Sequence, residues 1–209
     1  MHLPHTLILR FVAISITLLL LNYHFGEHLI RAIIPLYQWL IKQLDYRFDT
    51  VVLSIINQHG EQFLLLQTSL SQPFIHGAEI VTPSVAIPAG ATMPLGNVLL
   101  PVVVVLTTVL ALPVATASLS MRSYMTRLLL AIPLCLLIML TDTPTQLLKM
   151  VWESLNKQMQ INFSHQLPYF TYWCDFLNGG GLIALSIAVG VLVVGLINFA
   201  SKPLSENVN

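Results

Sequence analysis

Charged residues are scarce in this chain of 209 residues. Asp, Glu, Lys and Arg together make up 9% of it, and none of them occurs between Ile80 and Met121. Soluble domains average about 25% charged residues. The charges balance to zero and no run of basic residues occurs, so the sequence indicates no nucleic-acid partner. With 56% hydrophobic residues and a mean hydropathy of +0.78, the composition predicts an integral membrane protein.

Cysteine is also scarce, with two residues in the whole chain. Two cysteines cannot define a disulfide framework. Cys135 lies inside an apolar run and Cys174 lies outside one, so we expect the two to stay unpaired.

Four apolar segments are predicted to span the membrane. They run over Thr6–Tyr23, Asn97–Ser118, Tyr124–Thr141 and Gly181–Phe199. Pro113 is expected to kink the second segment, because proline removes a backbone hydrogen bond. A cleavable signal peptide is the alternative interpretation of the first segment. No clear small-residue cleavage site follows it, which favours a retained span.

The distribution of arginines predicts the orientation of these spans. The short stretch SLSMRSYMTR (118–127), which joins the second span to the third, carries Arg122 and Arg127 and no acidic residue, which places it in the cytoplasm by the positive-inside rule. An even number of spans then puts both termini in the cytoplasm. The segments on the opposite side carry an excess of acidic residues, in agreement with this orientation.

The first outer segment opens with an apolar, helix-prone stretch that ends near Leu44. Its periodicity predicts an amphipathic helix lying in the membrane interface, with Pro35 limiting its regularity. Two β-prone runs then flank the stretch Asn57–Gly60, which predicts a β-hairpin. The Pro- and Gly-rich stretch from Ser71 to Pro94 is expected to be a loop. The apolar stripe of the helix is formed by Leu29, Ile33, Leu36, Leu40 and Leu44.

The second outer segment begins with a predicted helix. Thr141, Asp142 or Thr143 can cap it, and Pro144 suits its first turn. Its apolar stripe is formed by Leu147, Leu148, Val151, Trp152 and Leu155.

An aromatic collar follows, with five aromatic residues in the eight from Tyr169 to Phe176, and Asn178 with three glycines leads into the last span. Such a cluster fits an interfacial anchor, and alternatively a docking surface for another membrane protein. The residues proposed to contact a partner are Tyr169, Phe170, Tyr172, Trp173 and Phe176.

The sequence thus predicts a mainly α, polytopic membrane protein. It has about four transmembrane helices and a small periplasmic cap that consists of a β-hairpin and interfacial helices. The chain divides into an N-terminal span (1–23), a periplasmic segment (24–96), a transmembrane hairpin (97–141), a periplasmic amphipathic helix with the collar (142–180), and a last span with a cytoplasmic tail (181–209).

Residues 24–28 read HFGEH, the H-x-x-E-H pattern of the inverted zinc proteases. On a helix, His24 and His28 share one face and could ligate one zinc ion, with Glu27 activating a water molecule. The pattern is short, and no third ligand is evident in the sequence. Gly26 also lowers the helix propensity that the motif needs. We therefore interpret the motif as the polar end of the first span and predict no metal and no cofactor.

A cysteine nucleophile is a second enzymatic hypothesis. Cys174 is expected near the outer surface, with His165 nine residues before it. Neither cysteine lies at the outer end of a span beside a basic partner, and Cys135 is placed within the membrane as a packing residue. The spans also hold almost no ionisable residues, which argues against a transporter. The alternative is an oligomeric pore, because Gly190 and Gly195 give the last helix small faces for close packing.

The stretches NVLLPVVVVLTTVLALP (97–113) and WCDFLNGGGLIALSIAV (173–189), together with the order of spans, resemble a family of bacterial membrane proteins. These are the small proteins associated with exosortases, of the exosortase H-associated type, in Gram-negative bacteria. The chain departs from the family pattern at Leu182, where a basic residue is expected. The resemblance implies location in the bacterial inner membrane and no known catalytic residue.

These observations predict a non-enzymatic accessory or assembly protein of the inner membrane. The resemblance associates it with exosortase-type sorting of surface proteins. Its expected partners are the lipid bilayer and another membrane protein. The alternative is a small membrane-embedded hydrolase that uses either the HFGEH zinc site or a cysteine nucleophile.

Overall fold

A computed structural model describes residues 5–70, 74–76, 79–81, 87–112, 121–159 and 170–200. Its elements in chain order are α1 (His5–Leu44), β1 (Phe48–Gln58), β2 (Glu61–Leu70), β3 (Phe74–His76), β4 (Glu79–Val81), β5 (Ile87–Pro94), α2 (Leu95–Ala111), α3 (Met121–Met159), α4 (Phe170–Phe176), the π-helical turn η2 (Leu177–Gly181) and α5 (Leu182–Ala200).

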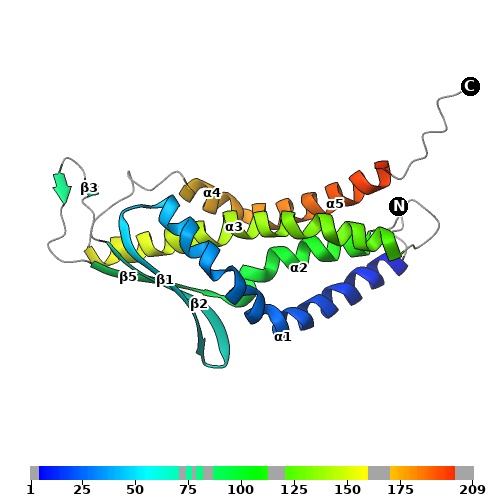
Figure 1. The fold of residues 1–209 in the computed structure, drawn as a ribbon, viewed down its shortest axis with the longest axis horizontal. Coiled ribbons are helices and arrows are strands. Elements are labelled where there is room, and N and C mark those ends of the chain that lie inside the picture. Colours follow the sequence, from blue (N-terminus) through cyan, green and yellow to red (C-terminus); the bar gives the residue numbers. More distant parts are fainter. Residues whose placement is uncertain are drawn as a thin grey trace, which may run out of the picture.

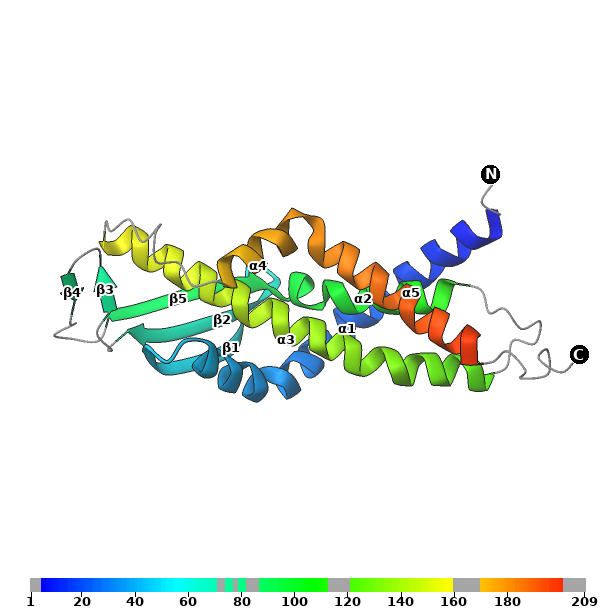
Figure 2. The same ribbon diagram turned by 90° about the horizontal axis from the view of Figure 1, so that it is seen from above.

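The molecule is elongated, with a helical bundle at one end and a β-sheet at the other (Figure 1). Helix α2 contacts α1, α3 and α5 and so forms the centre of the bundle. The first turn of α1 and the last turn of α5 lie at the bundle end that is remote from the sheet (Figures 1 and 2). We call the sheet, with the halves of α1 and α3 that pack on it, the cap.

Three helical stretches are long and apolar enough to cross a membrane: His5–Leu44, Tyr124–Lys157 and Phe170–Phe199. They contain the first, third and fourth predicted spans. The second predicted span corresponds to α2, which is apolar but has 17 residues and ends at Ala111. Its predicted continuation to Ser118, with the kink at Pro113, lies outside the described residues.

Helix α1 corrects one predicted boundary. The first span and the interfacial helix were expected as separate elements, but α1 is continuous for 40 residues and contains Pro35. It changes direction about midway along its length (Figure 1). Gly26 is buried near this point, and a Cβ atom there would lie 2.6 Å from Leu99 Cδ1 of α2. The glycine therefore permits a close approach of the two helices, which a larger residue would prevent.

The second half of α1 does not bury the face that carries the predicted apolar stripe. It buries another face of the helix. Ile30, Tyr37 and Ile41 are buried, whereas Leu29 and Leu36 of the predicted stripe are exposed. This half of the helix thus has two apolar faces. One packs in the protein core, and the other is exposed on the surface of the protein.

Helix α3 corrects a second boundary. A new helix was expected to begin between Thr141 and Thr143, but α3 runs through Pro144 without a break. Threonine hydroxyls on either side of the proline bond carbonyls of the preceding turn: Thr141 Oγ1 donates to Leu137 O, and Thr145 Oγ1 donates to Thr141 O. Such hydroxyl contacts are common where apolar helices contain proline. The predicted apolar stripe from Leu147 to Leu155 is confirmed, because all five residues are buried.

The predicted β-hairpin is confirmed. Strands β1 and β2 pair in antiparallel fashion, and Gln58 lies opposite Glu61. His59 and Gly60 have φ values of 53° and 84°, as a two-residue type I′ turn requires. The expectation of a loop over 71–94 is wrong at β3, β4 and β5. Strand β5 pairs with β2 and completes a three-stranded sheet in the order β1-β2-β5. Strands β3 and β4 form a separate two-stranded sheet.

One face of the three-stranded sheet forms the core of the cap. Along a row of paired positions, Leu53, Leu66 and Ala91 point to this face and are buried. Because β5 contributes small side chains here, Ala89 and Ala91, helix α3 can pack closely against it. Helix α1 packs on the β1 side (Figure 2). The cap is therefore a two-layer unit built from segments that are far apart in sequence.

The last helix joins the bundle through glycines. Gly180 in η2 has a φ of 102°, which favours glycine, and allows α4 to change direction into α5. A Cβ atom on Gly190 would lie 2.6 Å from Thr108 Cβ of α2, so this glycine allows close packing within the chain. The small face at Gly190 is thus used for internal packing, whereas no atom would meet a Cβ on Gly195 within 4 Å.

Candidate partner-binding surface and neighbouring polar sites

The described part of the predicted aromatic collar lies on α4, at the end of the bundle next to the cap (Figure 2). Tyr172 is 75% exposed, Phe176 is 55% exposed and Trp173 is 36% exposed. Trp173 and Phe176 pack together, with ring centroids 5.5 Å apart. Phe170 turns inward and packs against the cap core, and Tyr169 lies outside the described residues. From here on, the collar means Tyr172, Trp173 and Phe176.

Polar contacts fix the collar to α3. The side chains of Gln146 and Asn178 bond each other reciprocally: Gln146 Nε2 donates to Asn178 Oδ1 at 2.9 Å, and Asn178 Nδ2 donates to Gln146 Oε1 at 3.1 Å. Lys149 forms an ion pair with Asp175. Cys174 is buried on the face of α4 that points to α3. The exposed aromatic side chains therefore lie on a helix whose position is fixed by polar contacts to α3.

A layer of buried polar side chains runs through α3 beneath the collar. Asp142, Thr143, Thr145 and Gln146 are all buried. Asp142 Oδ1 accepts a long hydrogen bond of 3.5 Å from Gln146 Nε2, and Tyr37 of α1 donates to Thr143 at 3.5 Å. This stretch resembled a helix cap in the sequence, because Asp, Thr and Pro are typical of helix N-termini. The stretch instead lies inside α3, and its side-chain hydrogen bonds link α3 to α1 and to η2.

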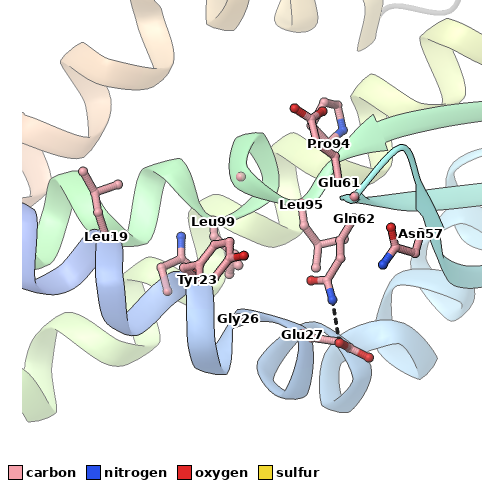
Figure 3. Close-up of a pocket in the computed structure, with 13 residues that line it drawn as sticks. Leu19, Tyr23, Gly26, Glu27, Asn57, Glu61, Gln62, Pro94, Leu95 and Leu99 are labelled. Atoms are coloured by element: carbon pink, nitrogen blue, oxygen red, sulfur yellow. Dashed lines mark hydrogen bonds between the residues drawn. The ribbon is translucent and has the colours of Figure 1, made fainter.

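The HFGEH motif lies within α1 and does not form a metal site in the described part of the chain. His24 and His28 are exposed. Glu27 Oε1 accepts hydrogen bonds from Arg31 at 2.9 and 2.6 Å, and its Oε2 accepts one of 2.7 Å from Gln62 of β2 (Figure 3). No cluster of three His, Cys, Asp or Glu side chains placed to hold a metal occurs among the described residues. Glu27 instead ties the hairpin to α1.

The two cysteines are free, as expected. Both are buried, and Cys174 has no exposed surface. Its thiol lies within hydrogen-bond reach of the Thr145 side chain. A nucleophile has to reach its substrate, and a fully buried thiol does not. His165, the proposed partner, lies outside the described residues.

A cavity of about 570 Å³ opens between α1, the hairpin tip and the start of α2 (Figure 3). Its apolar wall includes Leu19, Leu95 and Leu99. Its polar lining includes Asn22, Tyr23, Glu27, Asn57, Glu61 and Gln62. No local pattern in the sequence predicts this cavity, because the hairpin tip and α1 meet only in the folded chain.

A second feature that sequence reasoning missed joins α1, β1 and α3. Asp45 is 2% exposed, and it accepts hydrogen bonds from Arg47 Nε and Nη2, each at 2.7 Å. Trp152 Nε1 of α3 donates to the same carboxylate at 2.9 Å. The Arg47 guanidinium lies 4.3 Å from the centroid of the Trp152 ring, a cation–π contact. We call Asp45, Arg47 and Trp152 the cap lock.

Arg127 lies at the opposite end of the molecule. It was expected where the cytoplasmic loop meets the third span, and it lies in the first part of α3, where its side chain is fully buried. Its Nη1 donates to Val109 O at 3.1 Å and to Leu112 O at 2.9 Å, so it bonds the last carbonyls of α2. Arg10 of α1 donates to the Tyr124 hydroxyl nearby.

The chain matches no protein family, no curated protein and no solved structure. The function therefore has to be inferred from the fold and from the surfaces described above.

Proposed function

We propose that this protein is a four-span accessory or assembly protein of the bacterial inner membrane, without enzymatic activity, that binds another membrane protein through the collar. The observation that carries the proposal is the exposure of three aromatic side chains on a helix whose other face is tied to α3. Exposed aromatic residues on a helix that is fixed in position are typical of protein-binding surfaces.

The packing of α2 supports four spans. Its 17 residues rise about 26 Å, close to the thickness of about 30 Å of a bilayer core. It packs between three helices that are each long enough to cross the membrane. In this arrangement the ends of α1 and α5 that are remote from the cap face the cytoplasm. The buried Arg127 and the half-buried Arg10 lie at this end, which agrees with the positive-inside rule. The cap then stands in the periplasm.

The position of the collar favours a partner within or just above the membrane. It lies where the bundle meets the cap (Figure 2), which in the proposed orientation is the outer membrane interface. Aromatic residues alone also suit an interfacial anchor. The contacts of α4 and η2 with Lys149 and Gln146 favour a partner-binding surface over an interfacial anchor. They fix the collar in one geometry, which an anchor in fluid lipid does not need.

The resemblance in span order and in the two quoted stretches points to an exosortase-type machine as the system that this protein serves. The partner in that case is a polytopic membrane transpeptidase whose spans pack beside α4 and α5. The association with an exosortase is a separate proposal from partner binding by the collar. The first can be wrong while the second is correct.

The test replaces collar residues by serine in the full-length protein and measures retention of its partners in mild detergent. Tyr172→Ser combined with Phe176→Ser is expected to remove a partner that co-purifies with the wild type. Tyr46→Ser is the control, since Tyr46 is an 80% exposed aromatic residue in the connection between α1 and β1, outside α4. An unchanged set of partners in the double variant, with normal protein yield, would contradict the proposal.

A further inference from the structure

The cavity between α1, the hairpin tip and α2 combines three features that point to one class of ligand. It is about 570 Å³ in volume, its polar lining holds two carboxylates, and its apolar wall faces the bundle. No Lys, Arg or His is among the described residues that line it. Arg31 pairs with Glu27 from outside the lining. The carboxylate of Glu61 on the hairpin tip gives the cavity a negative balance.

An apolar row on α1 leads from this cavity toward the far end of the bundle. Val12, Ile16, Leu19 and Tyr23 follow at spacings of three and four residues, so they share one face of the helix. All four are between about half and four-fifths exposed, and Leu19 and Tyr23 also line the cavity. The row covers about 16 Å, since a helix rises 1.5 Å per residue. Half of a bilayer core is about 15 Å thick.

We propose that the cavity binds the ethanolamine headgroup of a phospholipid whose acyl chain lies along this row of α1. The inference rests on the membrane placement under Proposed function but is independent of the collar. The ammonium group of the lipid meets the carboxylate of Glu61 and the paired carboxylate of Glu27. The side chains of Asn22 and Asn57 offer neutral donors for the phosphate. A phosphatidylglycerol headgroup lacks the ammonium and brings an uncompensated negative charge toward two carboxylates.

The lipid connects two parts of the fold. The cavity is the place where the hairpin tip approaches α1, and the Gln62–Glu27 hydrogen bond spans it (Figure 3). A bound headgroup therefore contacts both the cap and the bundle. Binding adds stability only to the docked arrangement, because the cavity is lost when the hairpin separates from α1.

Native mass spectrometry of the full-length protein tests the proposal. The probe is an equal mixture of phosphatidylethanolamine and phosphatidylglycerol with identical acyl chains. The wild type is expected to retain phosphatidylethanolamine in preference. Glu61→Gln is expected to lower this preference about two- to fivefold, the range for one exposed charge pair. Glu153→Gln is the matched control, because Glu153 is an exposed carboxylate on α3 that does not line the cavity.

A second variant blocks the cavity itself. A Cβ atom on Gly96 meets no atom within 4 Å, so Gly96→Trp can place its ring in the cavity without a backbone clash. This variant is expected to lose retention of phosphatidylethanolamine, whereas Gly195→Trp, at another open glycine, keeps it. Excess soluble phosphoethanolamine competes only weakly if the acyl chain contributes as proposed; full displacement by it would refute the acyl-chain row.

Equal retention of the two lipids by the wild type would overturn the inference. So would a preference that neither Glu61→Gln nor Gly96→Trp changes. Measuring retention of the protein partner distinguishes a failure of the lipid proposal from a failure of the proposed function. Gly96→Trp should keep the partner that the collar variant loses, so each proposal can fail while the other stands.

Discussion

The cap lock allows a quantitative prediction for the stability of the cap. Asp45→Ala removes a buried carboxylate that accepts hydrogen bonds from Arg47 and from Trp152 Nε1. The indole N–H is then left buried without this acceptor, which costs about 1–3 kcal/mol. The Arg47 ion pair is lost as well, but Arg47 is 23% exposed and regains water, so this loss is smaller than for a fully buried pair. We expect a total destabilisation of about 3 kcal/mol.

Two further variants separate these contributions. Asp45→Asn keeps one acceptor oxygen for Trp152 and is expected to cost about half as much as Asp45→Ala. Trp152→Phe removes the donor and keeps most of the packing against Phe48, whose ring lies 5.5 Å from that of Trp152. The double variant of Asp45→Ala and Trp152→Phe should show a coupling energy of at least about 1 kcal/mol, as expected for residues in direct contact.

The assay is denaturant-induced unfolding of the detergent-solubilised protein, followed by circular dichroism because Trp152→Phe alters the fluorescence. Hydrogen exchange at the start of β1 locates the effect, since Asp45 lies three residues before Phe48, where this strand begins. Glu153→Gln is the control, an exposed carboxylate outside the cavity that is expected to change stability by less than about 0.5 kcal/mol. A cost for Asp45→Ala no larger than that of Glu153→Gln, or an absence of coupling to Trp152, would refute the reasoning.

Three more predictions concern the contacts that organise the bundle and are tested by the same unfolding assay. Gly26→Leu should destabilise by more than about 2 kcal/mol, because its Cβ meets α2, whereas Gly195→Leu has open space and should be nearly neutral; similar values for the two would disprove close packing at Gly26. Arg127→Leu leaves two carbonyls of α2 without a donor and should cost about 1–3 kcal/mol, and Arg127→Lys should cost less; the reverse order would contradict the capping role. Gln146→Leu and Asn178→Leu should each destabilise, and their combination should cost less than the sum; strict additivity would argue against the reciprocal pair.

The hairpin shows where sequence reasoning succeeds. Its turn is local, since His59 and Gly60 adopt positive φ values between two β-prone runs. The apolar stripe of α3 from Leu147 to Leu155 is also local, because its helical spacing alone predicts a buried face. Both features depend on residues within one or two turns of each other along the chain.

Strand β5 shows where such reasoning fails. Ile87–Pro94 contains two prolines and a glycine, a composition typical of loops. Its pairing with β2 joins residues such as Leu66 and Ala91, which are 25 positions apart, and no local pattern reports this pairing. The boundary at Asp142 failed for a related reason. Capping residues and Pro144 predict a helix start, but packing against α1 and η2 overrides that preference.

The candidate surfaces were predictable to different degrees. The collar was visible in the sequence because its aromatic residues are adjacent, and the structure adds which of them are exposed. The cap lock and the lipid cavity were not visible. Each is assembled from separate elements, and their polar residues have no distinctive spacing in the chain. HFGEH is the opposite case, where a recognisable pattern serves to connect Glu27 to Arg31 and Gln62.

Site-specific photocrosslinking tests the central claim, that the collar contacts another membrane protein, most directly. A photoreactive amino acid replaces Tyr172 or Phe176 in living cells, and Leu129 serves as the control because it is 73% exposed on the bundle away from the collar. We expect the same discrete protein adduct from both collar positions and none from position 129. Adducts with lipid alone at all three positions would contradict the account.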